Sequence, residues 1–260
     1  YINVPELYQK VKYHSIINND GFSIHVVNSS NNEFILRTTE LDEFENYIEN
    51  FTKILKRVKL VHVHFRKATS GAVTPENAHM FPVTTTKRVF RLSHNGFVAG
   101  FEKNNEKSDT RMMSEDPRFS SAIEYLIEKQ NPRKLVKYIK TRDFYGIAFL
   151  TSPDTVIAIS RNKDMHIYYD RSILCMSNSL LSLEKKIQLT KNIVLTARIP
   201  HASIENAIIV VTKNFDKNKI TVYRFREPKR EYYFYTCDHP YFYYVHFPRP
   251  RHFSPPWVED

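Results

Sequence analysis

The pattern of apolar and polar residues along the chain predicts strands, then helices, then strands again. Residues 22–27 alternate between apolar and polar as a strand does, and residues 34–37 form a second short strand. Residues 42–58 carry apolar side chains at helical spacing, and residues 60–65 have the composition of a buried strand. The first part of the chain is therefore expected to contain strands on both sides of a helix.

An Asn-Gly pair marks an expected turn in the next apolar segment. Residues 88–93 and 97–101 have strand character and flank Asn95-Gly96, two residue types that tolerate positive φ angles. This pattern predicts a hairpin-like arrangement. A polar loop is expected to follow over residues 103–117.

Helices and a second set of strands are expected after this loop. Residues 120–130 and 132–140 have helical periodicity, and the second helix opens with Pro132 at a tolerated early position. The order of elements predicts an α+β fold, a four-layer αββα sandwich in which two antiparallel sheets pack face to face beneath outer helices. The expected strands, rich in β-branched and aromatic residues, are 145–151, 155–160, 166–170, 173–177, 193–197, 207–212 and 219–225.

The composition changes sharply at residue 226. Residues 226–260 are rich in aromatic residues and then in proline, so no regular helix is expected beyond Phe247. Two interpretations are open: an edge strand and extended arm packed on its own domain, or a docking arm for a partner. The predicted organisation is a main domain at 1–185, further strands of the same domain at 186–225 and this arm.

Overall composition restricts the class of protein. With 42% hydrophobic residues among 260, the chain is expected to bury a large core. It has no apolar run of 18 residues and no signal-peptide pattern, and its two cysteines suit a reducing compartment, so a cytoplasmic location without membrane contact is expected. The net charge of +10 allows nucleic-acid binding, but the basic residues are scattered and no common nucleic-acid-binding module is visible. No cofactor and no metal site is expected.

Glycine usage draws attention to the segment from His62 to Gly96. The chain has 5 glycines, whereas average composition would give about 18. Gly21, Gly71 and Gly96 end the segments Asn-Asp-Gly, Thr-Ser-Gly and His-Asn-Gly. At such places a side chain would block a positive φ angle or a close backbone approach, so we expect these segments to surround a substrate.

Polar residues recur around these glycines in a characteristic order. The residues are Arg66, Thr69, Gly71, Asn77, His79, Pro82, His94, Asn95, Gly96 and Asp109. Their order and approximate spacing resemble those of the class II glutamine amidotransferases. Residues 19–24 resemble the Asp-Gly-x-Gly-Ile segment of that family, and residues 157–169 and 177–183 resemble its Arg-Asp and Ser-Glu segments in degraded form. The resemblance covers about residues 1–185.

The resemblance implies an N-terminal nucleophile hydrolase that acts on the side-chain amide of glutamine. The planar guanidinium of Arg66 suits a bidentate contact with the α-carboxylate of free glutamine, and Asp109 would hold its α-ammonium group. Thr69 and His79 would add further substrate contacts. The ammonia released would pass to a separate acceptor subunit, to a larger protein assembly or to water.

The same family supplies an oxyanion hole and a nucleophile. The side-chain amide of Asn95 and the N–H of Gly96 would stabilise the tetrahedral intermediate, although an Asn-Gly pair alone indicates only a turn. The thiol of an N-terminal cysteine attacks the amide, and its own α-amine acts as the base. The given chain begins at Tyr1, so we expect residues 1–4 to form the first strand, with the cysteine immediately or shortly before it. Cys175 and Cys237 cannot provide this geometry.

Two residues depart from the family pattern, and the absent N-terminal cysteine, the degraded second half and the aromatic-proline tail keep alternatives open. Lys67 stands where an aromatic residue is usual, and Ser70 where a histidine or asparagine is usual. The chain is then either a glutaminase and amidotransferase domain, or a catalytically inactive relative that serves as a structural or binding subunit of a larger assembly, viral assemblies included. A basic nucleic-acid-associated protein is a third possibility, which the net charge alone supports.

Overall fold

The computed structural model describes residues 2–51, 55, 57–101, 105–169, 174–178, 187–190, 193–195, 201–214 and 217–226. The chain divides into two compact units, residues 1–224 and 225–260. The predicted C-terminal arm, with Cys237, lies outside the described residues except for Arg226. Most of the Ser-Glu-like segment at 177–183 also lies outside them.

The N-terminal part forms a three-stranded antiparallel sheet in the order β2-β1-β3. Phe22 of β1 lies opposite Thr38 of β2 and Phe65 of β3. The buried ring of Phe44 packs against the rings of Tyr8, Phe22 and Phe65, with centroids 5.7–5.9 Å apart. The elements are α1 (Val4–Val11), α2 (Tyr13–Ile17), β1 (Gly21–Asn28), β2 (Glu33–Thr38), α3 (Leu41–Asn46), the π-helical turn η1 (Tyr47–Phe51) and β3 (Val58–Arg66).

The larger sheet has six antiparallel strands in the order β14-β13-β7-β6-β5-β4. Two smaller sheets have the orders β12-β8-β9 and β10-β11. The elements after β3 are η2 (Pro75–Asn77), β4 (Phe81–Thr84), β5 (Val89–Val98), α5 (Asp109–Glu115), α6 (Pro117–Lys129), α7 (Arg133–Thr141), β6 (Phe144–Thr151), β7 (Thr155–Arg161), β8 (Met165–Tyr169), β9 (Leu174–Ser177), β10 (Ile187–Thr190), β11 (Ile193–Leu195), β12 (His201–Ile204), β13 (Ala207–Asn214) and β14 (Lys217–Arg224).

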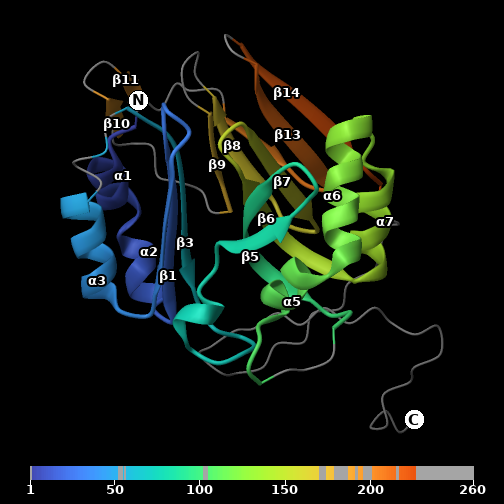
Figure 1. The fold of residues 1–260 in the computed structure, drawn as a ribbon, viewed down its shortest axis with the longest axis horizontal. Coiled ribbons are helices and arrows are strands. Elements are labelled where there is room, and N and C mark those ends of the chain that lie inside the picture. The colour runs from blue at the N-terminus through green and yellow to red at the C-terminus, as the bar shows by residue number, and fades with distance from the viewer. Residues whose placement is uncertain are drawn as a thin grey trace, which may run out of the picture. The chain divides into compact units, whose positions relative to one another are not determined.

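The layers of residues 1–224 are those expected from the sequence. Helices α1 to α3 lie on the outer side of the β2-β1-β3 sheet, and α6 and α7 lie on the outer side of the six-stranded sheet (Figure 1). His62 of β3 contacts Ser93 of β5, and Met165 of β8 packs in one cluster with Ile147 and Ile209. The two three-stranded sheets therefore face the six-stranded sheet, which confirms the predicted αββα sandwich.

The strand predicted at residues 1–4 is wrong, because helix α1 begins at Val4. Asn3 caps this helix: its Oδ1 accepts a hydrogen bond from Glu6 N at 3.3 Å. Pro5 follows at an early helical position, where its missing N–H removes no hydrogen bond. The sequence Asn-Val-Pro-Glu is thus a helix start.

The turn predicted at Asn95-Gly96 is also wrong. Strand β5 runs without interruption through both residues, which pair with Ile147 and Gly146 of β6. The φ angle of Gly96 is +150°, and a Cβ there would lie 1.9 Å from Tyr145 O. Glycine is therefore needed because two strands approach closely, not because the chain reverses.

Two predicted boundaries differ from the structure. The helix expected over 42–58 ends as α3 and η1 at Phe51, and its last expected residue already belongs to β3. The loop expected over 103–117 contains helix α5. Its N-cap is Ser108, whose Oγ accepts a hydrogen bond from Arg111 N at 3.2 Å. This cap marks the start of the helix, which the pattern of apolar residues did not indicate.

A buried chain of hydroxyl and imidazole groups joins the facing sheets. Thr151 Oγ1 lies 2.9 Å from His25 Nδ1 and 2.9 Å from His62 Nδ1. His62 Nε2 lies 2.7 Å from Ser93 Oγ. A hydroxyl has one hydrogen, so Thr151 donates to one neutral imidazole and accepts from the other, which gives the two rings opposite tautomers.

Burial between the sheets keeps several imidazoles neutral. It lowers the pKa of His62 and His79 well below the ordinary value, and it lowers the pKa of His64 to about 3. An unfolded histidine titrates near 6.5. Between these values the unfolded chain binds more protons than the folded chain, so acid favours unfolding.

We expect the free energy of unfolding to decrease as the pH falls from about 6.5 towards about 4. Each buried histidine contributes a slope of up to about 1.4 kcal/mol per pH unit in this range. Urea unfolding at a series of pH values measures the slope. H62Q should reduce it, whereas N105A, at an exposed position without a titratable group, should leave it unchanged. An equal slope in H62Q and the parent protein would contradict the assignment of the acid sensitivity to His62.

Candidate functional site

Most residues of the motif lie where the end of β3 meets β5 and the start of α5. Strand β3 ends at Arg66, which pairs with Gly21 of β1. The segment 67–74 leads from β3 into η2, and α5 packs against β5 (Figure 1). Segments distant in sequence thus meet at one end of the sandwich.

Arg66 is 3% exposed and holds the loop that follows β3. Its Nη1 donates to Ala72 O at 3.1 Å, and its Nη2 donates to Ser70 O at 2.6 Å and to Gly71 O at 3.4 Å. Burial lowers the pKa of Arg66, and the nearby Asp20 and Asp109 carboxylates offset this only in part, but a guanidinium remains a cation at physiological pH. The Nε hydrogen takes no part in these three bonds.

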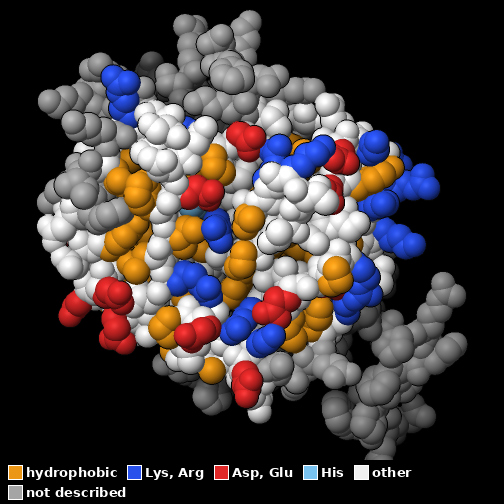
Figure 2. All heavy atoms as spheres, viewed as in Figure 1, with side chains coloured by type: hydrophobic (Ala, Val, Ile, Leu, Met, Phe, Trp, Pro, Cys, Tyr) orange, Lys and Arg blue, Asp and Glu red, His pale blue; other side chains and the backbone are white. Residues whose placement is uncertain are grey.

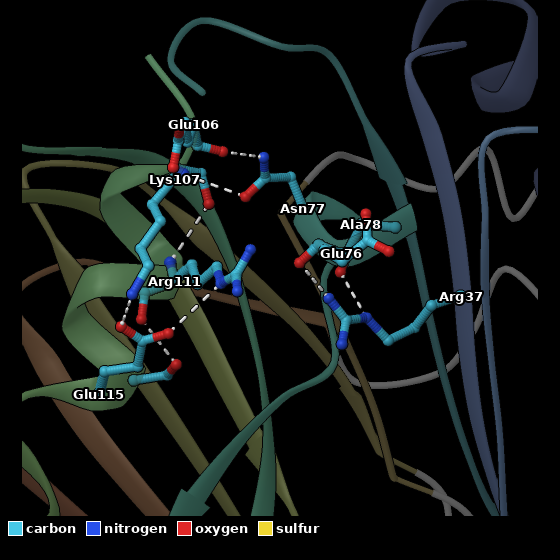
Figure 3. Close-up of polar contacts among 10 residues, drawn as sticks. Arg37, Glu76, Asn77, Ala78, Glu106, Lys107, Arg111 and Glu115 are labelled. Atoms are coloured by element: carbon cyan, nitrogen blue, oxygen red, sulfur yellow. Dashed lines mark hydrogen bonds and ion pairs between the residues drawn. The ribbon is translucent and has the colours of Figure 1, made fainter. Parts of the chain in front are cut away.

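Asn77 connects this loop to the segment before α5. Its buried Nδ2 donates to Ala72 O at 3.0 Å. The same Nδ2 donates to Glu106 O, and Oδ1 accepts from Ser108 N at 3.2 Å (Figure 3). The backbones approach so closely that a Cβ on Gly71, whose φ is +70°, would lie 2.5 Å from Ser108 N. One amide side chain thus satisfies backbone groups of both segments.

The Asp109 carboxylate connects α5 to β5. Its Oδ2 accepts from Val98 N at 2.7 Å, and its Oδ1 accepts from Thr110 N at 2.8 Å. Ser70 Oγ lies 3.4 Å from Oδ1, so the loop held by Arg66 also reaches this carboxylate. Asp109 as a whole is half-buried.

The predicted oxyanion-hole residues lie in β5. Asn95 is half-buried and Gly96 is exposed. Asn95 Oδ1 accepts a hydrogen bond from Lys163 Nζ at 2.6 Å. The Nδ2 donor of this amide therefore faces away from Lys163.

Behind these residues, two histidines support β5. His94 Nε2 donates to Tyr145 O at 3.0 Å, so its Nδ1 accepts from Thr110 Oγ1 at 3.2 Å. His79 Nδ1 accepts from His94 N at 3.3 Å, and the His79 ring stacks on His64 with centroids 3.8 Å apart. His79, which the sequence assigned to substrate contact, is thus buried beneath β5.

The segment next to Arg66 contains both departures from the family pattern. Lys67 Nζ lies 3.3 Å from Asp20 Oδ2, which also accepts from Ala68 N at 2.9 Å. Burial alone would raise the pKa of Asp20, but the Ala68 N–H and the Lys67 ammonium together lower it. Thr69 is exposed beyond this pair. Lys67 thereby ties the loop to the segment before β1.

Lys163 was missed by the sequence analysis. The Arg-Asn-Lys-Asp segment between β7 and β8 indicated only a turn, and 68 positions separate Lys163 from Asn95. No local pattern could place them together. Gly146 was missed for the same reason, because its need for glycine arises from the approach of β5.

A depression of about 220 Å³, lined by charged side chains and by Phe81 and Pro82, lies beside the Asn77 network. Arg37 and Arg111 line it together with Glu76 and Glu115 (Figure 3). Arg37 Nε donates to Ala78 O at 2.8 Å, and Arg111 Nε lies 3.3 Å from Glu115 Oε1. Side chains of both charges thus line this depression.

In the described residues, neither metal-ligand groups nor membrane-spanning helices nor surface charge indicate a further site. Among the described residues no group of three or more His, Cys, Asp and Glu side chains could hold a metal ion. In the same part of the chain, none of the helices combines the length and the apolar character needed to cross a membrane. On the face shown in Figure 2, basic side chains are mixed with acidic ones, so this face does not carry a single sign of charge.

We expect N77A to loosen the site without unfolding the protein. The substitution leaves buried backbone groups of two segments without partners, each at a cost of about 1–3 kcal/mol. Urea unfolding should show this loss, and limited proteolysis should cleave faster within residues 67–76. N105A, at an exposed position of the neighbouring segment, is the matched control. Equal stability and cleavage in both variants would contradict the role given to Asn77.

Comparison with known proteins agrees with the fold. No protein-family model and no curated protein matches the chain. Glutamine phosphoribosylpyrophosphate amidotransferase from B. subtilis, in complex with ADP and GMP, superposes on 88% of the chain with a TM-score of 0.59 and 11% identity. A structure described as the allosteric regulatory enzyme of purine biosynthesis covers 84% with a TM-score of 0.53 and 13% identity.

The chain spans 48% and 47% of the lengths of these two structures. At such low identity the likeness concerns the fold. The chain therefore has an α+β fold that it shares with these two solved structures.

Proposed function

We propose that this protein binds free L-glutamine and hydrolyses its side-chain amide to glutamate and ammonia. The observation that carries the proposal is one continuous polar network at the end of the sandwich. It leads from Arg66 through Ser70 to Asp109, and from Asp109 to the backbone of β5 just beyond Asn95-Gly96. A cation, a carboxylate and two neutral donors are the groups that a glutamine amide hydrolase needs.

Each group has a distinct role in this proposal. The guanidinium of Arg66 pairs with the α-carboxylate, and Asp109 accepts hydrogen bonds from the α-ammonium group. Asn95 Nδ2 and Gly96 N–H donate to the oxygen of the side-chain amide as it becomes an oxyanion. Thr69, exposed in the loop after β3, adds a substrate contact. His79 supports these residues from behind through its bond with His94 N.

The proposed nucleophile is an N-terminal cysteine ahead of helix α1. Ile2 N donates to Val58 O, so the chain enters α1 beside the first residue of β3. Strand β3 has nine residues, which separate its ends by about 26 Å. A cysteine directly before Tyr1 would therefore lie far from Arg66. One that reaches the Arg66 end needs about eight more residues of extended chain.

The reaction then proceeds by acyl transfer. The cysteine sulfur attacks the amide carbon while the α-amine of the same residue takes the thiol proton. The α-amine then returns the proton to the leaving nitrogen. The tetrahedral intermediate collapses, ammonia departs, and a γ-glutamyl thioester on the cysteine remains. Water hydrolyses the thioester to glutamate and regenerates the thiol. The ammonia passes to an acceptor domain, to a separate subunit of a larger assembly, or to water.

One observation favours a second candidate, a non-catalytic relative that acts as a structural or binding subunit. The guanidinium of Arg66 already donates to three carbonyl oxygens of its own loop and is almost fully buried. Such an arginine stabilises the loop even without a ligand. The two candidates differ in whether glutamine binds and whether glutamate appears.

We expect full-length protein to release glutamate from glutamine and to be labelled by a glutamine-mimicking diazo ketone. D109N removes the charge that holds the α-ammonium group, so glutamine affinity should fall by about 30-fold or more. Isothermal titration measures the affinity, and a coupled assay measures glutamate release. D154N, which changes an exposed carboxylate paired with Arg88, serves as the control.

The two measurements separate the candidates. Glutamine binding that D109N abolishes, without glutamate release or labelling, would support the non-catalytic relative. Equal affinities in D109N and D154N would contradict the role assigned to Asp109. No binding by the folded parent protein would refute the glutamine site altogether.

A further inference from the structure

The turn between β7 and β8 brings Lys163 to the proposed oxyanion hole. Lys163 Nζ donates to Asn95 Oδ1 at 2.6 Å, and Lys163 is half-buried. The turn is fixed from two sides. Asn162 N donates to Asn206 Oδ1 at 3.0 Å, and Ser160 Oγ donates to Lys163 O at 2.5 Å. The ammonium group is thus directed at Asn95 by ordered backbone.

The chemistry of the lysine determines the orientation of the amide. An ammonium group has three donors and no acceptor, so the Asn95 atom that faces Lys163 must be the oxygen. The amide nitrogen, with its two hydrogens, then points away from Lys163. A charge-assisted hydrogen bond to the oxygen also polarises the amide and makes its N–H groups better donors.

The ammonium group of Lys163 is partly desolvated and has a neutral acceptor at Asn95, which favours a negative charge that develops near this amide. Burial lowers the pKa of Lys163, which reflects the cost of desolvating its ammonium group. Its acceptor at Asn95 is a neutral amide oxygen, not a carboxylate. An oxyanion that forms next to Asn95 Nδ2 would interact favourably with this ammonium through the amide.

We propose that Lys163 is a positioning residue that orients and polarises the Asn95 amide toward an anionic oxygen on the side-chain carbonyl carbon, Cδ, of the bound substrate. This proposal rests on the proposed function, because it assumes that glutamine occupies the site. It also adds a preference: the site binds an anionic γ-group more tightly when Lys163 is present. L-glutamate, whose γ-carboxylate is charged where glutamine has a neutral amide, is the direct probe.

The first test compares L-glutamate and L-glutamine binding to the full-length protein by isothermal titration. K163M keeps the length of the side chain but removes its donors and its charge. It should weaken glutamate binding by about tenfold and glutamine binding by less than about threefold. K163R retains a donor-only cation and should recover most of the loss. K87M, at an exposed position paired with Glu128, controls for loss of one surface charge.

A double-mutant cycle tests whether Lys163 acts through Asn95. In an N95A background K163M should have little further effect on glutamate affinity, because the amide that it orients is absent. With active enzyme, K163M should lower kcat by about tenfold and change KM little, since the interaction strengthens only in the transition state.

The outcomes distinguish this inference from the proposed function. If the parent protein binds both amino acids and K163M weakens both by the same factor, Lys163 merely supports the fold and the inference is wrong. Full additivity of K163M and N95A would also refute it. If the parent protein binds neither amino acid, the proposed function fails and the inference fails with it. Binding without hydrolysis leaves the glutamate-to-glutamine ratio as the deciding measurement.

Discussion

The candidate site depends on the contact between the loop after β3 and the segment just before α5. Neither segment has regular secondary structure, so their backbone groups need other partners. Arg66 supplies donors to the first loop, and Asn77 supplies both a donor and an acceptor between the two segments. Asp109 then fixes α5 to the end of β5. Removal of any of these side chains would leave buried polar groups without partners.

This contact also bears on the choice between an enzyme and a non-catalytic relative. An arginine that is already held by its own loop loses little conformational entropy when a carboxylate binds. The bonds of Arg66 to loop carbonyls therefore do not conflict with a substrate role, since its Nε–H and the face of the guanidinium take no part in them. The same bonds would persist in a relative without a nucleophile. Stability of the site and catalysis are thus separable properties in this fold.

The sequence predicted those features that depend on local patterns. Strands β1, β3 and β6 follow from apolar periodicity, and the order of strands and helices gave the correct layers. The two wrong predictions, the strand at residues 1–4 and the turn at Asn95-Gly96, have different causes. At residues 1–4 the local helix cap at Asn3 outweighs the apolar residues on either side of it, which by themselves favour a strand. The extended path of Asn95-Gly96 depends on β6, about 50 positions away, which no local pattern contains.

The buried imidazoles and Lys163 make the electrostatics of the site interdependent. His94 must be neutral for its Nδ1 to accept from Thr110 while its Nε2 donates to Tyr145 O. Burial, and to a smaller extent the Lys163 charge, lower the pKa of His94, whereas the Asp109 carboxylate raises it. Protonation of His94 would remove the acceptor for Thr110, beside Asp109 at the start of α5. A lysine that polarises Asn95 thus also helps to keep the support of β5 in its neutral form.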